Sequence, residues 1–341
     1  MNRMGEKSDS RFTRRTFLTG ASALSAASLL GLPQKAEAEP PPEVKKIRFV
    51  HTPAICLAPQ YLAEDLLRLD GFSEVQYVQH NYTAVDALAQ GLADLSMEAS
   101  PTCVTALDER KAIVLLAGIH AGCYELFGRE KVQAIPDLRG KTVAISAFGA
   151  SEHVFVSSMV AYVGMNPSKD VNWLVAGTNP DAMRLFIEGR ADAFLGFAPQ
   201  PQELREKGVG RLIVDTAQDR PCSQYFCCSV AANRDFVAKN PVATKRAVRA
   251  LLKAADVCAR EPERVASMLR DRGYEPRYEI GLKVLKSLPY NRWREANHED
   301  TIRFHALRLH EAGMIKSNPS NLIAQGTDWR FLRELKRELK A

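Results

Sequence analysis

The sequence has no large surplus of charge of either sign. Its 341 residues carry 46 Lys and Arg against 40 Asp and Glu, a formal net charge of +6. Residues 1–38 hold six of the basic and three of the acidic side chains, so the rest of the chain has a net charge of +3. Nucleic-acid binders need a strong basic patch, so we expect no nucleic-acid partner.

Several short motifs of enzymes are also missing. The chain has no G-x-G-x-x-G after an expected strand, no Walker lysine loop and no G-x-S-x-G elbow. No stretch after residue 38 is apolar for long enough to span a bilayer. The sequence therefore shows no sign of a nucleotide-binding enzyme, an α/β-hydrolase or a membrane-spanning domain.

The first 38 residues have the pattern of an export signal. Arg14 and Arg15 precede an apolar run of small residues from Ala21 to Leu32, and Ala36-Glu37-Ala38 follows as a cleavage site of the Ala-x-Ala type. We expect residues 1–38 to be a twin-arginine signal peptide, which places the mature protein in the periplasm. A retained N-terminal anchor is the alternative, and the well-formed cleavage site argues against it.

After a proline-rich linker over residues 39–45, strand and helix patterns alternate in two successive units. The alternation predicts parallel sheets with helices on their faces, and two units suggest two lobes. From Asp235 onward the pattern is helical, with Pro241, Pro262 and Pro319 at expected helix starts. The expected strands cover residues 46–51, 75–78, 95–97, 114–119, 138–145, 171–175, 193–197 and 212–214.

Ligands of open α/β sheets lie beyond the carboxyl ends of the strands, and here those ends are mostly small or polar. The segment Phe148–Ser151 is the best candidate, because Gly149 lets the backbone approach a ligand and the next helix start presents free N–H groups. For any single loop an ordinary turn is the simpler interpretation, so the prediction depends on several loops coinciding. We predict that the ligand is bound by His51, Thr52, Ser100, Thr102, His120, Gly149, Ala150, Ser151 and Asn179, with Gln224 and Tyr225 from a strand that crosses between the lobes.

The seven cysteines are an odd number, so they cannot all form disulfides within one chain. Cys222, Cys227 and Cys228 lie near one another but fit no zinc spacing, and neighbours on a strand point to opposite faces. They are weak candidates for a metal or redox site, and the simpler interpretation is a buried strand that uses cysteine as a small apolar residue. Partial disulfide formation stays open. We expect no bound cofactor.

Several segments, weak when taken singly, recur in a characteristic order along the chain. They are residues 51–53 (HTP), 58–63 (APQYLA), 87–95 (ALAQGLADL), 137–144 (DLRGKTVA), 186–193 (FIEGRADA), 234–236 (RDF) and 240–241 (NP). In this order they resemble the periplasmic solute-binding proteins of the nitrate, sulfonate, taurine and thiamine-precursor group. The resemblance implies an α/β fold of the type II periplasmic binding protein class, with a helical C-terminal part. It implies crossings near residues 125–128 and 226–231, one lobe from residues 46–126 and 229–341, and another from residues 127–228.

For function, the resemblance implies the substrate-binding component of an ABC importer and not an enzyme. The ligand would be a small polar or anionic organic solute, such as a sulfonate, nitrate or a thiamine precursor, held between the lobes. The partners would be the permease and ATPase subunits of the transporter at the inner membrane.

The alternative is a cofactor- or metal-dependent enzyme or sensor on the same fold, such as a thiamine-pyrimidine synthase-like protein. The twin-arginine route, the cysteines and the pair His51 and His120 motivate it. Fungal relatives of that type carry a cysteine-rich motif, of which only Phe226-Cys227 matches here, and the helix over residues 57–69 lacks the lysine that would hold pyridoxal phosphate. A purely structural interaction protein is disfavoured, because the sequence shows no repeats.

Overall fold

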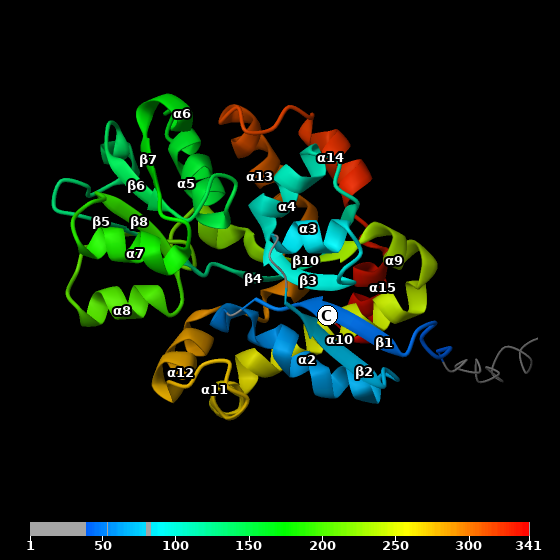
Figure 1. The fold of residues 1–341 in the computed structure, drawn as a ribbon. Helices are drawn as coiled ribbons and strands as arrows, with labels where there is room; N and C mark the ends of the chain where they lie inside the picture. The colour runs from blue at the N-terminus through cyan, green and yellow to red at the C-terminus, as the bar shows by residue number, and fades with distance from the viewer. Residues whose placement is uncertain (1–38, 53, 80–82, 341) are drawn as a thin grey trace, which may run out of the picture. The chain divides into compact units, whose positions relative to one another are not determined.

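Two five-stranded sheets flanked by helices form the core of residues 39–52, 54–79 and 83–340, which the computed structural model describes (Figure 1). The first sheet has the strand order β2-β1-β3-β10-β4, and the second has the order β7-β6-β8-β5-β9. The predicted export signal, residues 1–38, lies outside the described residues, as does Pro53. Among the described helices, none is long and apolar enough to cross a bilayer.

In each five-stranded sheet, three adjacent strands pair in parallel. The fourth strand runs antiparallel to both of its neighbours, and the fifth is the edge strand beyond it. The first sheet contains β1 (Lys46–Val50), β2 (Glu74–Val78), β3 (Leu95–Ala99), β4 (Ile113–Ala121) and β10 (Phe226–Asn233). The second contains β5 (Tyr124–Gly128), β6 (Thr142–Ile145), β7 (Asn172–Val175), β8 (Ala193–Phe197) and β9 (Arg211–Asp215). The antiparallel strands, β10 and β5, are the first that the chain forms after it crosses from one sheet to the other.

The forward crossing is very short. Only Gly122 and Cys123 separate the end of β4 from the start of β5. Gly122 has a positive φ of 65°, and a Cβ atom at this position would lie 2.2 Å from the Cα of Ala217. Glycine is therefore required both for the backbone angle and for the close contact with the segment after β9.

Most helices lie between the strands of the first sheet, or after its last strand, along the chain. These are α2 (Ala58–Leu69), α3 (Ala84–Ala89), α4 (Ser100–Asp108), α9 (Arg234–Lys239), α10 (Pro241–Arg260), α11 (Pro262–Asp271), α12 (Tyr278–Ser287), α13 (His298–Glu311), α14 (Pro319–Gly326) and α15 (Arg330–Glu338). Between the strands of the second sheet, the chain forms α5 (Ser151–Tyr162), α6 (Pro167–Asp170), α7 (Asn179–Ile187) and α8 (Gln200–Glu206). Short 3₁₀ turns are η1 (Ile55–Leu57), η2 (Ile135–Leu138), η3 (Cys222–Gln224) and η4 (Arg292–Arg294).

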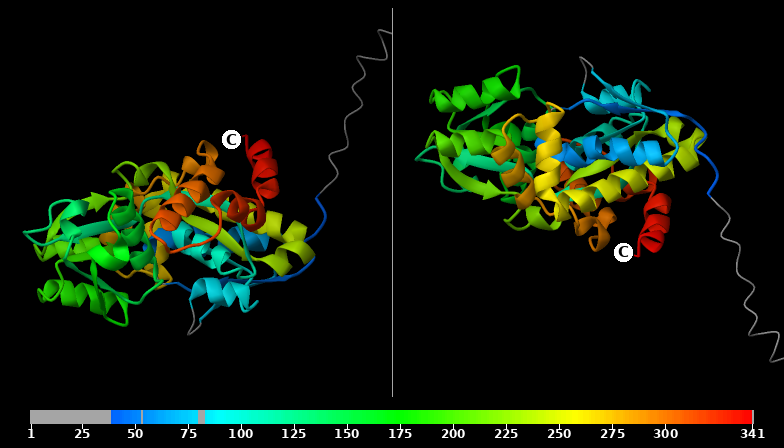
Figure 2. Two further views of the ribbon diagram at one scale, coloured as in Figure 1. Left: turned by 90° about the horizontal axis from the view of Figure 1, so that it is seen from above. Right: turned by 90° about the horizontal axis from the view of Figure 1, so that it is seen from below.

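Helices α2 and α10 run side by side against the first sheet (Figure 2). Proline occupies the first turn of each, where its missing N–H costs no intrahelical hydrogen bond. Glu43, from the predicted linker, accepts hydrogen bonds from the N–H groups of Val242 and Ala243 at 2.8 Å each. A carboxylate at this helix N-terminus also complements the helix dipole.

The predicted α/β class and helical C-terminal part are confirmed, and all of the expected strands are present. Helices begin at Pro241, Pro262 and Pro319, as predicted. The predicted lobe boundaries at residues 126 and 228 fall inside β5 and β10. Each of these strands belongs wholly to one sheet, so the chain passes between the sheets outside both strands. The first crossing lies at Gly122 and Cys123, just before the expected residues 125–128.

Strand β10 lies between β3 and β4, and its pairing with β4 is irregular. Near the bulge, the N–H of Gly118 donates to Nδ1 of His298 at 2.6 Å, and the His298 ring stacks on Phe226. His298 in turn donates from Nε2 to the carbonyl of Trp293 at 3.0 Å. These contacts leave no room for a side chain at position 118, where an added Cβ would lie 2.4 Å from the Phe226 ring.

We therefore expect Gly118→Ala to destabilise the protein by about 1–3 kcal/mol, through overpacking against Phe226. The free energy of unfolding in urea measures this effect. Gly281→Ala is the matched control, because its Cβ would meet its nearest atoms at 3.9 Å within a helix. That change should be neutral or stabilising by about 0.5–1 kcal/mol. Equal stability of the two variants would contradict the packing described here.

Candidate functional site

A cavity of about 420 Å³ lies at the carboxyl ends of the parallel strands, with walls from the loops of both sheets. This volume is in the range of small-molecule sites. Many of the residues predicted from sequence to bind a ligand line it. They are His51, Thr52, Thr102, Gly149, Ala150, Ser151 and Asn179.

The wall formed by the first sheet is held in place by α2. Gln60, fully buried, donates from Nε2 to the carbonyl of Val50 at 2.9 Å and accepts from the N–H of Met97 at 2.8 Å. One side chain thus joins the ends of β1 and β3. The N–H of Thr52 donates to the hydroxyl oxygen of Tyr61 at 3.2 Å, which fixes the loop that follows β1. The wall is therefore largely pre-formed.

On the side of the second sheet, the N-terminus of α5 opens onto the cavity. Gly149 has a positive φ of 81°, and Ala150 occupies the N-cap without a side chain able to accept a hydrogen bond. The first intrahelical hydrogen bond runs from Val154 to the carbonyl of Ala150, so the N–H groups of the preceding turn have no partner within the helix. A negatively polarised ligand group is favoured at such a position.

Two side chains on opposite walls have buried polar atoms without partners among the described residues. They are Oγ1 of Thr102, on α4, and both Oδ1 and Nδ2 of Asn179, at the start of α7. Both residues line the cavity. Because buried polar groups in native proteins are nearly always hydrogen-bonded, these atoms are positioned to be satisfied by a ligand or by water.

The other predicted residues lie elsewhere. Ser100 is fully buried, and its hydroxyl is 2.8 Å from that of Ser229. His120 is also fully buried, behind Cys228. Gln224 is exposed in the 3₁₀ turn η3, and Tyr225 stacks on Phe304 with ring centroids 4.0 Å apart. The turn before β10 directs both Gln224 and Tyr225 away from the cavity.

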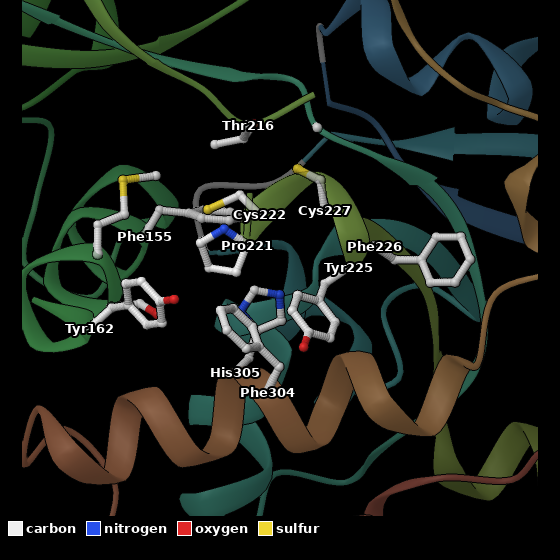
Figure 3. Close-up of a pocket in the computed structure, with 13 residues that line it drawn as sticks. Phe155, Tyr162, Thr216, Pro221, Cys222, Tyr225, Phe226, Cys227, Phe304 and His305 are labelled. Atoms are coloured by element: carbon white, nitrogen blue, oxygen red, sulfur yellow. The ribbon is translucent and has the colours of Figure 1, made fainter. Parts of the chain in front are cut away.

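Tyr225 instead lines a second, much smaller cavity. Figure 3 shows it between β10, α5 and α13, with Tyr225, Cys222 and Cys227 among its lining residues. Its volume is about 20 Å³, which is enough for one water molecule. His305 lines it, and neither of its ring nitrogens has a hydrogen-bond partner among the residues that the structure describes. Burial lowers the pKa of His305 to about 4, so this imidazole is neutral at physiological pH.

Two carboxyl groups line the larger cavity, and none of its described lining residues is Lys or Arg. Glu152 accepts from the N–H of Ser146 at 2.7 Å and from the Ser146 hydroxyl. Glu98 accepts from the hydroxyl of Ser96 at 2.8 Å, and burial raises the pKa of Glu98 to about 8. At neutral pH, Glu98 is therefore largely protonated and can donate a hydrogen bond.

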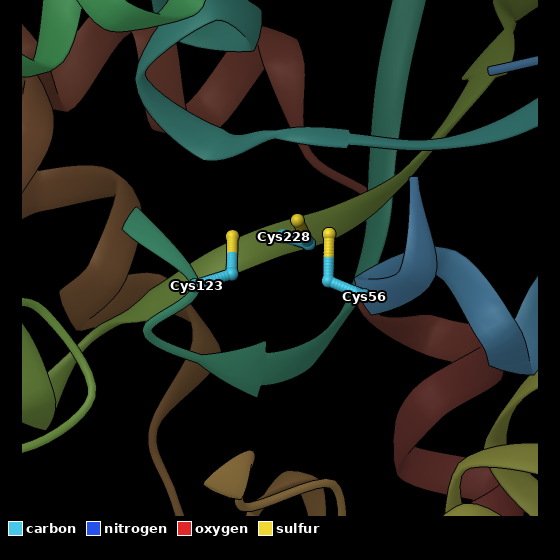
Figure 4. Close-up of side chains that lie close together, drawn as sticks. All are labelled: Cys56, Cys123 and Cys228. Atoms are coloured by element: carbon cyan, nitrogen blue, oxygen red, sulfur yellow. The ribbon is translucent and has the colours of Figure 1, made fainter. Parts of the chain in front are cut away.

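Three thiols also line the cavity, and they come from distant parts of the chain (Figure 4). Cys56 lies in η1, Cys123 in the crossing after β4, and Cys228 on β10. Their sulfur atoms all lie within 4.8 Å of one another. A fourth sulfur, that of Cys227, is 2.9 Å from Cys123 and 4.0 Å from Cys228. All of these cysteines are free.

The bulge in β10 explains how adjacent residues can join one cluster. Phe226 and Cys228 pair with Ala121 and His120 of β4, so Cys227 is an extra residue in this part of the ladder. As the sequence predicted, Cys227 and Cys228 line different cavities. Their sulfurs nevertheless remain close, with Cys123 beside both.

The electrostatics of the cluster favour one thiolate. Hydrogen bonds from the thiols of Cys123, Cys227 and Cys56, together with the charge of His120, lower the pKa of Cys228 well below its ordinary value. Burial raises the pKa of Cys123 and Cys227, so these thiols stay protonated. For His120, burial opposes protonation, but the charge of Cys228 and nearby backbone carbonyls outweigh it and raise the pKa.

The sequence did not predict Glu98 and Glu152 as lining residues of the cavity. It also did not predict that Cys56 and Cys123 lie beside Cys228. Cys56 and Cys123 both follow expected strands, so the carboxyl-end rule that selected His51 could also have selected them. Glu98 lies inside a strand, where the rule does not apply. Of the predicted metal candidates, Cys228 belongs to the three-thiol group, Cys227 adjoins it, and Cys222 lines the smaller cavity.

Comparisons with solved structures show which proteins share this arrangement. The periplasmic nitrate-binding protein NrtA from Synechocystis PCC 6803 superposes with a TM-score of 0.70 at 16% identity, over 88% of this chain and 90% of that one. The alkanesulfonate-binding protein SsuA from Xanthomonas axonopodis pv. citri gives 0.68 at 16%, over 86% and 99%. The desulfurization enzyme DSZB gives 0.60 at 14%, over 87% and 100%. These likenesses show the periplasmic binding protein fold.

Comparisons of the sequence give a single match. No curated protein matches the chain significantly. One family model does, described as NMT1/THI5 like, and it spans residues 74–265. Because this match covers more than half of the sequence, the chain belongs to the NMT1/THI5-like family, in agreement with the resemblance seen in its sequence.

Proposed function

We propose that the protein is the periplasmic substrate-binding component of an ABC importer, exported by the twin-arginine route, and that it holds a small polar organic solute in the larger cavity. The fold is shared with proteins named for binding nitrate and alkanesulfonate. In this proposal the solute contacts both walls, the two sheets close on it by a hinge motion, and the permease and ATPase subunits receive it.

The observation that carries this proposal is the pair of buried polar groups on Thr102 and Asn179, which have no hydrogen-bond partner in the described part of the chain. They stand on opposite walls of one cavity, on helices that follow strands of different sheets. A solute that bonds to both would stabilise the closed arrangement by its own binding energy. The uncapped N-terminus of α5, with Ser151 at its first position, supplies further donors.

The charges of the cavity favour some solutes over others. Glu98 and Glu152 face the solute without a lysine or arginine among the described lining residues, so a small anion such as nitrate would depend largely on helix N–H groups as counter-charge. Tyr124 and Phe197 add aromatic surface, with ring centroids 5.6 Å apart. We therefore infer that an uncharged, thiamine-precursor-like heterocycle with amino donors is bound in preference to nitrate or sulfonates.

An enzyme on the same fold is the second candidate, favoured by Cys228, which lines the cavity and whose pKa is lowered by the neighbouring thiols. DSZB shows that this fold can support an enzyme. The two functions differ in what happens to a bound solute. A binding protein returns it chemically unchanged after prolonged incubation, and mass spectrometry of the recovered solute distinguishes the two.

A thermal-shift screen tests the solute class. The panel comprises aminopyrimidine thiamine precursors, flavins, aromatic acids, alkanesulfonates and nitrate. We expect the aminopyrimidines to raise the melting temperature most, because a ligand bound only to the native state stabilises it by mass action. A larger shift with nitrate or sulfonates would overturn the inferred preference for uncharged solutes but not the role in solute binding. No shift with any class, together with turnover of one of them, would overturn both.

Substitutions in the walls test the location of the site. Asn179→Ala and Ser151→Ala should each weaken binding of the solute found in the screen by about 1–3 kcal/mol, roughly ten- to hundred-fold. Isothermal titration calorimetry measures the change. His310→Ala is the control, because His310 is exposed on α13 and does not line the cavity. Unchanged affinity in both wall variants would place the solute elsewhere.

The pKa of Glu98 gives a pH-dependent prediction. Between the ordinary carboxyl pKa of 4.5 and the raised value of about 8, the native protein keeps a proton that the unfolded chain has lost. Stability contributed by neutral Glu98 is therefore complete below pH 4.5 and is lost as the pH rises towards 8, by up to about 1.4 kcal/mol per pH unit.

Glu98→Gln has no such titration, so its stability relative to wild type should increase across this window. Urea unfolding of both proteins at several pH values measures the difference. A difference that does not depend on pH would show that Glu98 is ionised normally.

A further inference from the structure

We propose that the thiols of Cys56, Cys123 and Cys228 form a binding site for one thiophilic d¹⁰ metal ion, of the Zn²⁺, Cd²⁺ or Cu⁺ type, in the wall of the larger cavity. Throughout, we call these three residues the thiol site. The proposal goes beyond solute import and does not depend on it.

The geometry of the thiol site matches the requirements of such an ion. Sulfurs bound to one Zn²⁺ at about 2.3 Å lie about 3.8–4.0 Å from one another. The three sulfurs already lie within 4.8 Å of one another, so small side-chain rotations would bring them to bonding distance. They converge from η1, the crossing and β10 (Figure 4). Thiolates are the protein ligands that select soft cations.

Two cysteines outside the thiol site, Cys103 and Cys258, have the environment of apolar core residues. Cys103 on α4 and Cys258 on α10 are each completely buried. Neither belongs to a group of sulfurs that could hold an ion among the described residues. The thiol site instead borders open space, so its sulfurs can bind an ion that enters through the cavity.

His120 is a second, independent observation. It is completely buried, and its Nδ1 donates to the carbonyl of Gly122 at 2.9 Å. Its Nε2 makes no hydrogen bond with the described residues, and Cys228 is its cross-strand neighbour in the pairing of β10 with β4. This arrangement orients the imidazole towards Cys228, as outer groups orient the ligands of metal sites. His120 is thus a positioning residue for Cys228.

Binding would proceed by exchange of protons for the ion. Every ligand thiol that is still protonated would lose its proton as its sulfur bonds to the metal, and the protons released would pass to solvent through the cavity. Three thiolate ligands would leave the ion able to take water or a group of the solute as a further ligand. Cys227 lies beside the site as a spare sulfur, 2.9 Å from Cys123.

Titration of the reduced protein with Cd²⁺ under anaerobic conditions tests the proposal. We expect one Cd²⁺ per chain, with a thiolate-to-metal charge-transfer band in the ultraviolet, and displacement of bound Zn²⁺ with the same stoichiometry. Cys56→Ser, Cys123→Ser and Cys228→Ser should each weaken binding by more than the 10–100-fold that is typical of outer-group changes. Cys222→Ser is the matched control and should bind as wild type does, because Cys222 lies outside the thiol site.

His120→Gln separates positioning from structure. It should weaken Cd²⁺ binding by about 10–100-fold while the charge-transfer band still saturates at one ion per chain, because the Cys228 sulfur is then less firmly oriented. Thermal melting of each variant without metal confirms that it is folded.

Wild-type protein that shows no charge-transfer band would overturn the proposal, whatever the variants do. So would equal binding by Cys228→Ser and wild type, or a disulfide between Cys123 and Cys227 in protein isolated from the periplasm without reductant. A failed solute screen would leave the proposal intact, because metal binding is measured with the ion alone.

Discussion

The pairing of β10 with β3 on one side and β4 on the other is the constraint on which the cavity depends. This strand brings the chain back from the second sheet and must satisfy backbone groups along both edges. Its bulge at Cys227 allows pairing to continue while two adjacent side chains serve different cavities. The contacts of Gly118, Phe226 and His298 hold β4 against it, and Gly122 then allows the chain to leave for the second sheet.

The architecture could be predicted well from sequence because its signals are local. Alternating strands, glycines that end helices and prolines that begin them each act within a few residues, and the observed elements follow them. The carboxyl-end rule also located much of the cavity, including Asn179 and Ser151 on the second sheet's side. These successes share one cause, since the position of a loop relative to its strand can be read without knowledge of the tertiary fold.

The rest of the site depends on contacts between distant segments. Gln224 and Tyr225, which the sequence predicts in the cavity, are not among its lining residues, because the chain forms a 3₁₀ turn before β10 instead of continuing as a strand. Glu98 became a cavity residue because of its place in β3, and its raised pKa reflects burial that only the assembled protein creates. The convergence of Cys56, Cys123 and Cys228 is likewise a property of the tertiary structure and of no sequence motif.

The cavity contains groups with opposite preferences for the charge of a solute. Carboxyl groups and a thiolate repel simple anions, whereas the exposed N–H groups at the start of α5 attract them. Protonated Glu98 reduces this conflict at neutral pH. If the proposed function is correct, this combination favours a solute with both donors and acceptors over one with a full negative charge.

The wide separation of the three cysteines along the chain has a thermodynamic consequence. In the unfolded protein, bringing Cys56, Cys123 and Cys228 to one point requires closing two long loops, and the entropic cost grows with loop length. A zinc finger differs, because its ligands are close in sequence and the metal itself drives folding. Here the folded chain has an extensive apolar core of its own, so the thiols are pre-assembled by folding. An ion bound to them would discriminate strongly between the native and unfolded ensembles, and its loss would lower stability without removing the fold.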